Sequence, residues 1–228
     1  MSIPRPQLIT PMKRFAFALV ALLASWSITA TAQTTYSSMP GGSSVKVDGT
    51  SSLHDWEMEG KIIGGSIEFG PGINLDASQA GIGDLHDNKV PAKSHLGVPV
   101  TSIHSKADHL PDVMDRLMQK TLKEPDFPRI EFTMTDLVFK APHDAGKPFN
   151  FDVTGNLSIA GKTNTVTFPV TIEALDAGKL RIQGTAPVKM TAYGVDPPAP
   201  NFGLGMMKCG DDVQIIFDWT VRKREPAK

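Results

Sequence analysis

The second half of the chain alternates between apolar and polar residues with a period of two. Between 149 and 159 the apolar residues occupy the odd positions and the polar residues the even ones, and Gly155 keeps the phase. A strand directs successive side chains to opposite faces, whereas a helix brings residues to one face every 3.6 positions. The pattern therefore predicts a strand with one buried and one solvated face, and it returns at 165–174, 179–190 and 213–221.

Short links that contain glycine separate these segments. Ala160–Thr163 and Asp176–Gly178 have the length of tight hairpin turns, so we expect consecutive strands to be antiparallel neighbours. Pro169 and Pro187 lack an N–H group, and each should lie at a bulge or face away from a pairing partner. Four earlier segments also read as strands and bring the expected number to eight: 44–47, 56–69, 98–104 and 129–138.

Eight antiparallel strands with one apolar face each can form two facing sheets or one closed barrel. The interior of an eight-stranded barrel is either filled by its own side chains or holds one small ligand. Both possibilities stay open on the pattern alone. The residues expected to line one inward surface are Phe132, Met134, Phe149, Phe151, Val153, Phe168, Val170, Phe217 and Trp219.

Residues 111–123 depart from the strand pattern and repeat apolar residues with helical spacing. Pro111 suits a first helical turn and Pro125 blocks continuation, so we expect one amphipathic α-helix. The helix either covers the barrel or gates the mouth of a ligand channel, and methionine, which adapts to variable shapes, favours the gate. In the second case the residues at the mouth are Met114, Met118 and Leu122.

The first 32 residues have the order of a secretory signal peptide. A basic pair, Lys13 and Arg14, precedes an apolar run at 15–24, and Ala30–Ala32 provides a small-x-small cleavage site. The run is shorter than the roughly 20 residues that span a bilayer. The expected new N-terminus, Gln33, is not a cysteine that could carry lipid. We therefore expect a mature protein that is soluble outside the cytoplasm and has no permanent membrane anchor.

Charge and cysteine content narrow the possible partners. Of 23 basic residues three lie in the first 32, which hold no acid, so 20 bases face 24 acids in the remainder. A mildly acidic chain without a basic run is not expected to bind nucleic acid. The single cysteine, Cys209, cannot form an intramolecular disulfide and is interpreted as a small loop residue.

The sequence contains no recognisable catalytic or metal motif. None of the six histidines has the spacing of a zinc site, and neither a G-x-S-x-G elbow nor a phosphate-binding glycine loop occurs. We expect no metal, no cofactor and no catalytic residue. His54 precedes a strand together with Asp55, where the pair closes a turn or, alternatively, His54 contacts the head group of a ligand.

Several motifs resemble the YceI-like family, the bacterial periplasmic polyisoprenoid-binding proteins. Residues 48–56 (DGTSSLHDW) resemble its opening in a GTS-x-LHDW variant, and 155–163 (GNLSIAGKT) resemble its G-x-L-x-I-x-G-x-T hairpin. The helix and following strand around 114–132, the Tyr193-Gly194-Val195 turn and 210–217 follow in family order. The segment 71–97 carries few of the family's marks.

The resemblance implies an all-β fold, an eight-stranded antiparallel lipocalin-like barrel with one amphipathic α-helix, without metal or catalytic machinery. We expect a signal peptide (1–32), a flexible mature N-terminus (33–43) and a YceI-like lipid-binding domain (44–224) that sequesters or carries a long-chain isoprenoid lipid. Two alternatives remain: an isomerase or cyclase that acts on a lipid in the same barrel, and a solid barrel that acts through its surface. A homodimer is compatible with the sequence.

The N-terminal pattern predicts cleavage after Ala32. The intact mass of the exported protein should correspond to a chain that begins at Gln33. A mature protein that still carries the apolar run 15–24 would contradict export as a soluble protein.

Overall fold

The computed structural model describes residues 33–78, 82–175, 178–199 and 207–225. The expected signal peptide at 1–32 and residues 176 and 177 of the expected second link lie outside the described residues. Within them the elements follow in the order β1 (Thr34–Ser38), β2 (Ser44–Ser51), β3 (Trp56–Gly60), β4 (Gly64–Phe69), β5 (Ala92–Pro99), η1 (Val100–Ser102), β6 (Ile103–Ser105), α1 (Pro111–Thr121), β7 (Arg129–Phe139), β8 (Phe149–Ile159), β9 (Lys162–Ala174), β10 (Lys179–Lys189), η2 (Met190–Tyr193) and β11 (Cys209–Lys223).

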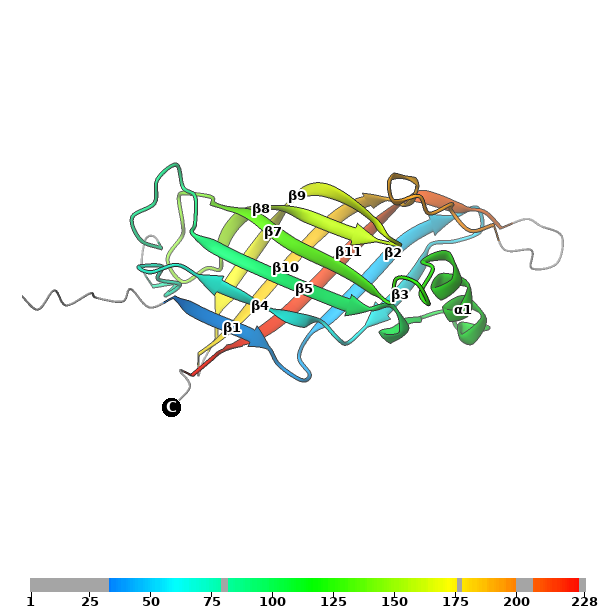
Figure 1. The fold of residues 1–228 in the computed structure, drawn as a ribbon, viewed down its shortest axis with the longest axis horizontal. Coiled ribbons are helices and arrows are strands. Elements are labelled where there is room, and N and C mark those ends of the chain that lie inside the picture. Colours follow the sequence, from blue (N-terminus) through cyan, green and yellow to red (C-terminus); the bar gives the residue numbers. More distant parts are fainter. Residues whose placement is uncertain (1–32, 79–81, 176–177, 200–206, 226–228) are drawn as a thin grey trace, which may run out of the picture. The chain divides into compact units, whose positions relative to one another are not determined.

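Eight strands form a closed antiparallel ring (Figure 1). Their order is β1-β4-β5-β7-β8-β9-β10-β11, and β11 pairs back to β1. The inward positions of the long strands are the apolar positions of the alternating pattern, and in β8 every second residue from Phe149 to Ile159 is buried. The predicted eight-stranded barrel with one α-helix is confirmed.

The last strand, β11, has two neighbours along one of its edges. Its final residues, Val221–Lys223, pair with β1, whereas Val213–Asp218 pair with β2. The chain continues from β2 to β3 and β6 as a three-stranded extension of the sheet. The extension and β1 therefore pair with the same edge of β11, the extension at Val213–Asp218 and β1 at Val221–Lys223.

The end of the barrel far from α1 is filled by aromatic side chains. Phe149 and Phe151 are fully buried and pack against Phe139, with ring centroids 6.0 and 5.7 Å apart. His143 stacks on Phe149 at 4.0 Å. Nearer the middle of the barrel, Gly155 of β8 leaves room for the ring of Phe132, which any Cβ at this position would meet.

The expectation that residues 33–43 are flexible is wrong for Thr34–Ser38, which form β1. This strand pairs with β4 on one side and β11 on the other. Tyr36 packs edge-on against Phe69 at 6.0 Å, and Trp219 donates its Nε1–H to Ser38 Oγ at 2.8 Å. A segment with only one large apolar residue shows no alternation, but its backbone completes two hydrogen-bonded ladders.

Other predicted boundaries shift where the chain bends. The expected strand at 56–69 is two strands, β3 and β4, separated by 61–63, and the expected strand at 98–104 is split between β5 and β6 by η1. The helix begins at Pro111 as predicted and ends at Thr121, two residues earlier than expected.

Pro169 and Pro187 each have one strand edge without a pairing partner, as the sequence predicted. The ladder between β9 and β10 covers only Val170–Ala174 and Leu180–Gly184, and Pro169 and Pro187 lie beyond it. Each therefore has one edge without a ladder, so the missing N–H leaves no inter-strand partner unsatisfied.

Among the described residues, no helix combines the length and apolar character needed to cross a lipid bilayer.

Ser38 and Ser37 provide a matched test of barrel closure. Ser38→Ala removes the acceptor of the buried Trp219 N–H, so we expect a loss of about 1–3 kcal/mol in the free energy of unfolding. The buried hydroxyl of Ser37 has no hydrogen-bond partner in the described structure, so Ser37→Ala should be neutral or stabilising. Urea unfolding of both variants measures the difference, and equal effects would contradict the role given to Ser38.

Candidate functional site

Two apolar cavities lie inside the barrel. The outer cavity, of about 930 Å³, is at the end covered by α1, and the inner cavity, of about 100 Å³, lies deeper between the strands. Val47, Ile130 and Ile215 line both cavities and therefore mark their junction. The two cavities are therefore adjacent, and the inner one lies further from the mouth.

The inner cavity has an almost wholly apolar wall. Its polar lining residues are Ser94, whose hydroxyl donates to the Ser66 carbonyl oxygen at 3.0 Å, and Glu131. The side chain of Glu131 is 46% exposed on the outside of the barrel. A ligand group in this cavity would find hydrocarbon surface and little else.

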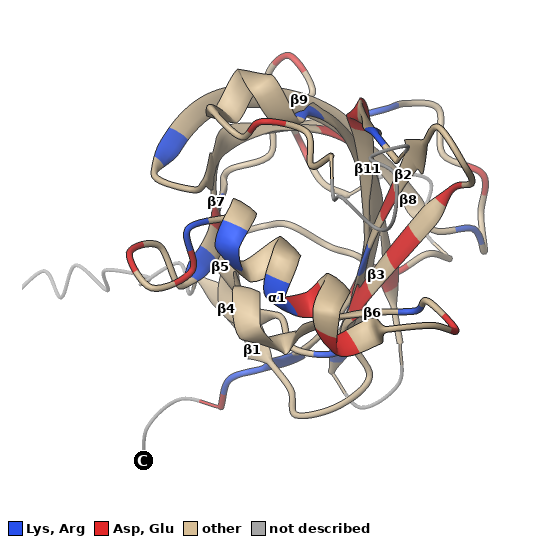
Figure 2. Cartoon of the chain, turned by 90° about the vertical axis from the view of Figure 1, so that its right-hand side faces the viewer, with Lys and Arg blue, Asp and Glu red and all other residues tan. Residues whose placement is uncertain are grey.

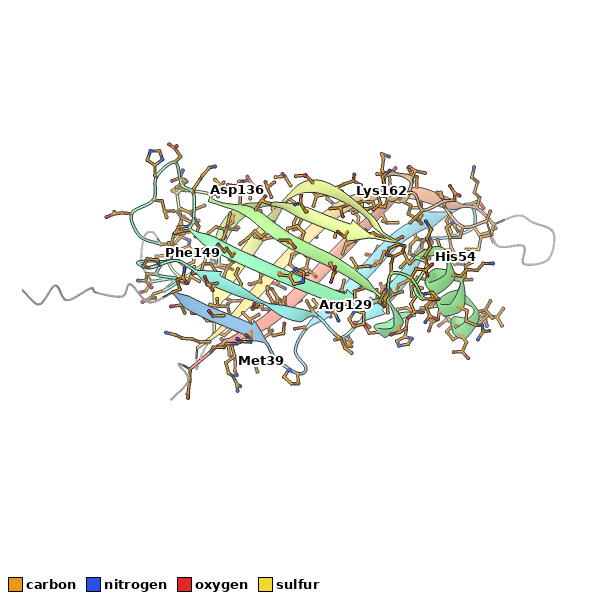
Figure 3. The ribbon with its side chains drawn as sticks, viewed as in Figure 1. Met39, His54, Arg129, Asp136, Phe149 and Lys162 are labelled. Atoms are coloured by element: carbon orange, nitrogen blue, oxygen red, sulfur yellow. The ribbon has the colours of Figure 1, made fainter. Side chains whose placement is uncertain are left out.

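The nine residues expected to line one inward surface fall into two groups. Seven line the inner cavity: Phe132, Met134, Val153, Phe168, Val170, Phe217 and Trp219. Phe149 and Phe151 line neither of the two cavities and belong to the filled end (Figure 3), where Phe149 lies far from His54.

The helix α1 lies across the wide end of the barrel (Figure 2) and packs against β6. Met114, Met118 and Leu122, the residues expected at the mouth, all line the outer cavity, and no residue of α1 is fully buried. Because its apolar face looks onto open volume, this helix contributes less packing than a helix seated on a core.

One carboxylate ties the helix to the sheet extension. Asp115 Oδ1 accepts the backbone N–H of Ser105 at 2.6 Å, and its Oδ2 lies 2.7 Å from His104 Nδ1. The Asp115 side chain is only 15% exposed. These bonds hold α1 at its middle to β6.

The loop between β2 and β3 places His54 at the rim of the outer cavity. Ser51 Oγ accepts the N–H of His54 at 3.2 Å and donates to the His54 carbonyl oxygen at 2.6 Å. Trp56 donates its Nε1–H to the Thr50 carbonyl oxygen at 3.0 Å. Its indole lies so close to Gly49 that any Cβ there would meet the ring. Hydrogen bonds and packing between residues of the loop and its flanking strands therefore fix the conformation of the loop.

Two weak acids lie in the wall of the outer cavity: Tyr193 is buried and Cys209 is half-buried. Burial raises the pKa of the Tyr193 hydroxyl, which the Asn164 side chain partly opposes, and burial also raises the pKa of the Cys209 thiol. Both groups are therefore neutral at neutral pH and contribute no charge to the cavity.

Residues 33–221 match the family model of the YceI-like domain. This chain belongs to the YceI-like family. The family match begins at Gln33 and so includes β1.

Solved structures of other proteins share the YceI-like fold. BcnA of Burkholderia cenocepacia has 23% identity and a TM-score of 0.53, over 78% of this chain and 95% of that one. A polyisoprenoid binding domain from Saccharophagus degradans, implicated in plant cell wall breakdown, has 14% identity and a TM-score of 0.56, over 83% and 98%. The YceI protein of Campylobacter jejuni has 16% identity and a TM-score of 0.50, over 74% and 85%.

At sequence identities of 14–23% these structures show a similarity of fold. None of the curated proteins compared with the chain has a significantly similar sequence.

Most of the outer cavity of this YceI-like chain is lined by residues that the sequence did not single out. The strands supply Val47, Met58, Ile103, Val188, Val213 and Ile215. Val188, Val213 and Ile215 share the apolar phase of the predicted strands, which was the available signal. Phase alone does not tell which end of a strand lies beside a cavity. The described residues contain no group of three or more potential metal ligands.

The link between α1 and β6 can be tested through Asp115. Asp115→Ala removes both acceptor oxygens, and the loss of charge-assisted bonds worth about 1.5–3 kcal/mol should raise amide exchange in α1 by roughly tenfold or more. Asp115→Asn keeps one acceptor for the Ser105 N–H and should have a smaller effect. Unchanged exchange in both variants would mean that apolar contacts alone hold α1.

Proposed function

We propose that this YceI-like chain binds a long-chain isoprenoid lipid, of the polyprenyl or isoprenoid quinone type, and sequesters or carries it outside the cytoplasm. The observation that carries the proposal is the pair of adjoining apolar cavities, the inner of which has an almost purely hydrocarbon wall. The polyisoprenoid-binding relative from Saccharophagus degradans supports the same ligand class.

The proposed tail site runs from the outer cavity into the inner cavity, whose volume of about 100 Å³ holds the end of the tail. The tail contacts Phe132, Met134, Val153, Phe168, Val170, Phe217 and Trp219. Phe149 and Phe151, also expected in the channel lining, form the packed floor beneath it. Each CH₂ group buried there contributes about 0.8 kcal/mol, and the ordering of a flexible tail offsets much of this gain. Binding should therefore discriminate poorly between chain lengths.

The proposed lid is α1. Met114, Met118 and Leu122 face the outer cavity, and flexible methionine side chains can follow ligands of different width. Since no residue of α1 is fully buried, the helix can move outward without exposing a packed core.

Binding is favoured over catalysis by the positions of the ionisable groups. His54, Asp55, Asp108 and His109, which line the outer cavity, are exposed at its rim. Acid–base chemistry on a bound lipid would require a carboxyl or imidazole group beside the buried tail. The carboxyl-bearing residue among the described lining residues of the inner cavity is Glu131, whose side chain is 46% exposed.

Export is proposed on two observations. The first 32 residues have the order of a signal peptide, and the family match begins immediately after them, at Gln33. Such a protein would hold its lipid in the periplasm.

Mass spectrometry of lipid extracted from the purified protein identifies the ligand. We expect an isoprenoid in stoichiometric amount. A purified protein that carries no lipid and takes up none of the isoprenoids offered to it would contradict the proposal.

Val153 and Val221 offer a matched pair for the tail site. Both are buried, but only Val153 lines the inner cavity. Val153→Trp should fill that cavity, block a long ligand and leave a stable fold. Val221→Trp has no void to enter and should destabilise by roughly 1–3 kcal/mol or more. Lipid binding and thermal unfolding are measured on both, and equal destabilisation would argue for a solid core at Val153.

A further inference from the structure

The outer cavity has an unbalanced set of charged groups at its rim. Its charged lining residues are Asp55, Glu57, Lys106 and Asp108. Two of them are already paired with residues that do not line the cavity: Glu57 Oε2 lies 2.7 Å from Lys46 Nζ, and Lys106 Nζ lies 3.0 Å from Glu59 Oε2. The described lining therefore holds three carboxylates and one lysine, and that lysine already has a carboxylate partner.

The two remaining carboxylates have no partner. The side chains of Asp55 and Asp108 are exposed, and within the described part of the chain neither makes a hydrogen bond or an ion pair. Asp55 lies in the loop between β2 and β3, and Asp108 lies between β6 and α1. They therefore belong to two different walls of the mouth, and both contribute negative charge to it.

His54 adds a hydrogen-bond acceptor at the same rim. Its Nδ1 lies 2.7 Å from the Asp55 carbonyl oxygen, which can only accept, so the proton of the neutral ring is on Nδ1. Nε2 then carries a lone pair. A head group at this mouth meets acceptors from His54, Asp55 and Asp108.

From this arrangement we infer that the ligand's head group carries no negative charge and donates hydrogen bonds, and that Asp55 and Asp108 exclude anionic heads. The inference rests on the proposed function, because it assigns the head to the outer cavity. The apolar wall of the inner cavity provides no site for a polar head, so the head remains at the rim. A phosphate or carboxylate there would face two unpaired carboxylates, whereas the one lysine of the described lining, Lys106, already pairs with Glu59.

Hydroxyl and ammonium heads share the required chemistry, and matched lipids separate them. The mature protein is incubated with an equimolar mixture of geranylgeraniol, geranylgeranyl amine and geranylgeranyl phosphate, and the bound fraction is analysed by mass spectrometry after gel filtration. We expect the alcohol or the amine to exceed the phosphate at least tenfold. Their ratio tells whether the head is neutral or cationic.

The charge dependence is tested with the double variant Asp55→Asn and Asp108→Asn. The preference against the phosphate should fall severalfold, and in the unaltered protein it should fall at high salt, where the Debye length shrinks to about 3 Å. The control double variant Asp84→Asn and Asp87→Asn alters two exposed acids in the loop between β4 and β5 that line neither cavity. It removes the same number of charges and should leave the preference unchanged. Thermal unfolding shows that all variants are folded.

The outcomes separate the inference from the proposed function. Binding of the phosphate as well as, or better than, the alcohol and the amine would overturn the head-group assignment and leave lipid binding intact. A preference that survives in the double variant would also overturn it. Failure of all three lipids to bind would remove the proposed function, and the inference with it.

Discussion

Closure of the backbone ladder by β1 is the constraint on which the rest of the barrel depends. Seven strands with one apolar face would leave two open edges and an inner surface in contact with water. Thr34–Ser38 supply the missing strand between β4 and β11. Ser38 fastens it, because its hydroxyl accepts from Trp219 at 2.8 Å and donates to the Gly65 carbonyl oxygen at 3.2 Å, so one side chain joins three strands.

The cavity follows from the way β11 is shared. A strand edge can pair with only one neighbour at each residue, and β11 passes from β1 to β2 between Val221 and Asp218. Beyond this point the wall continues into β3 and β6 and does not return to β4 by hydrogen bonds among the described strands. The opening is covered by α1, whose attachment through Asp115 is local. The wide cavity therefore lies at this end, and the aromatic floor lies at the other.

The strands from 149 to 221 could be predicted because one face of each is buried and the other is wetted, which leaves alternation in the sequence. The strand β1 could not, since Tyr36 is its only large apolar residue and its place depends on partners more than 25 positions away in the chain, such as Ile67. The apolar face of α1, with Met114, Met118 and Leu122, could be predicted because helical spacing reveals it, and these residues line the outer cavity. The anchoring role of Asp115 depends on β6, which short local patterns do not reveal.

The inner cavity was beyond prediction for a different reason. Val153 and Val221 are both buried valines in the apolar phase, yet only the first lies beside a void. Phase tells which way a side chain points and not whether the space opposite is filled. An empty volume of about 100 Å³ costs the fold roughly 2 kcal/mol at the 24 cal/mol per Å³ measured for engineered cavities. A hydrocarbon tail would recover this energy on entering, whereas the packed floor of Phe139, Phe149 and Phe151 has none to recover. If the proposed lipid binds, the asymmetry between a filled end and an open end would give it a direction, with its tail toward the floor and its head toward His54.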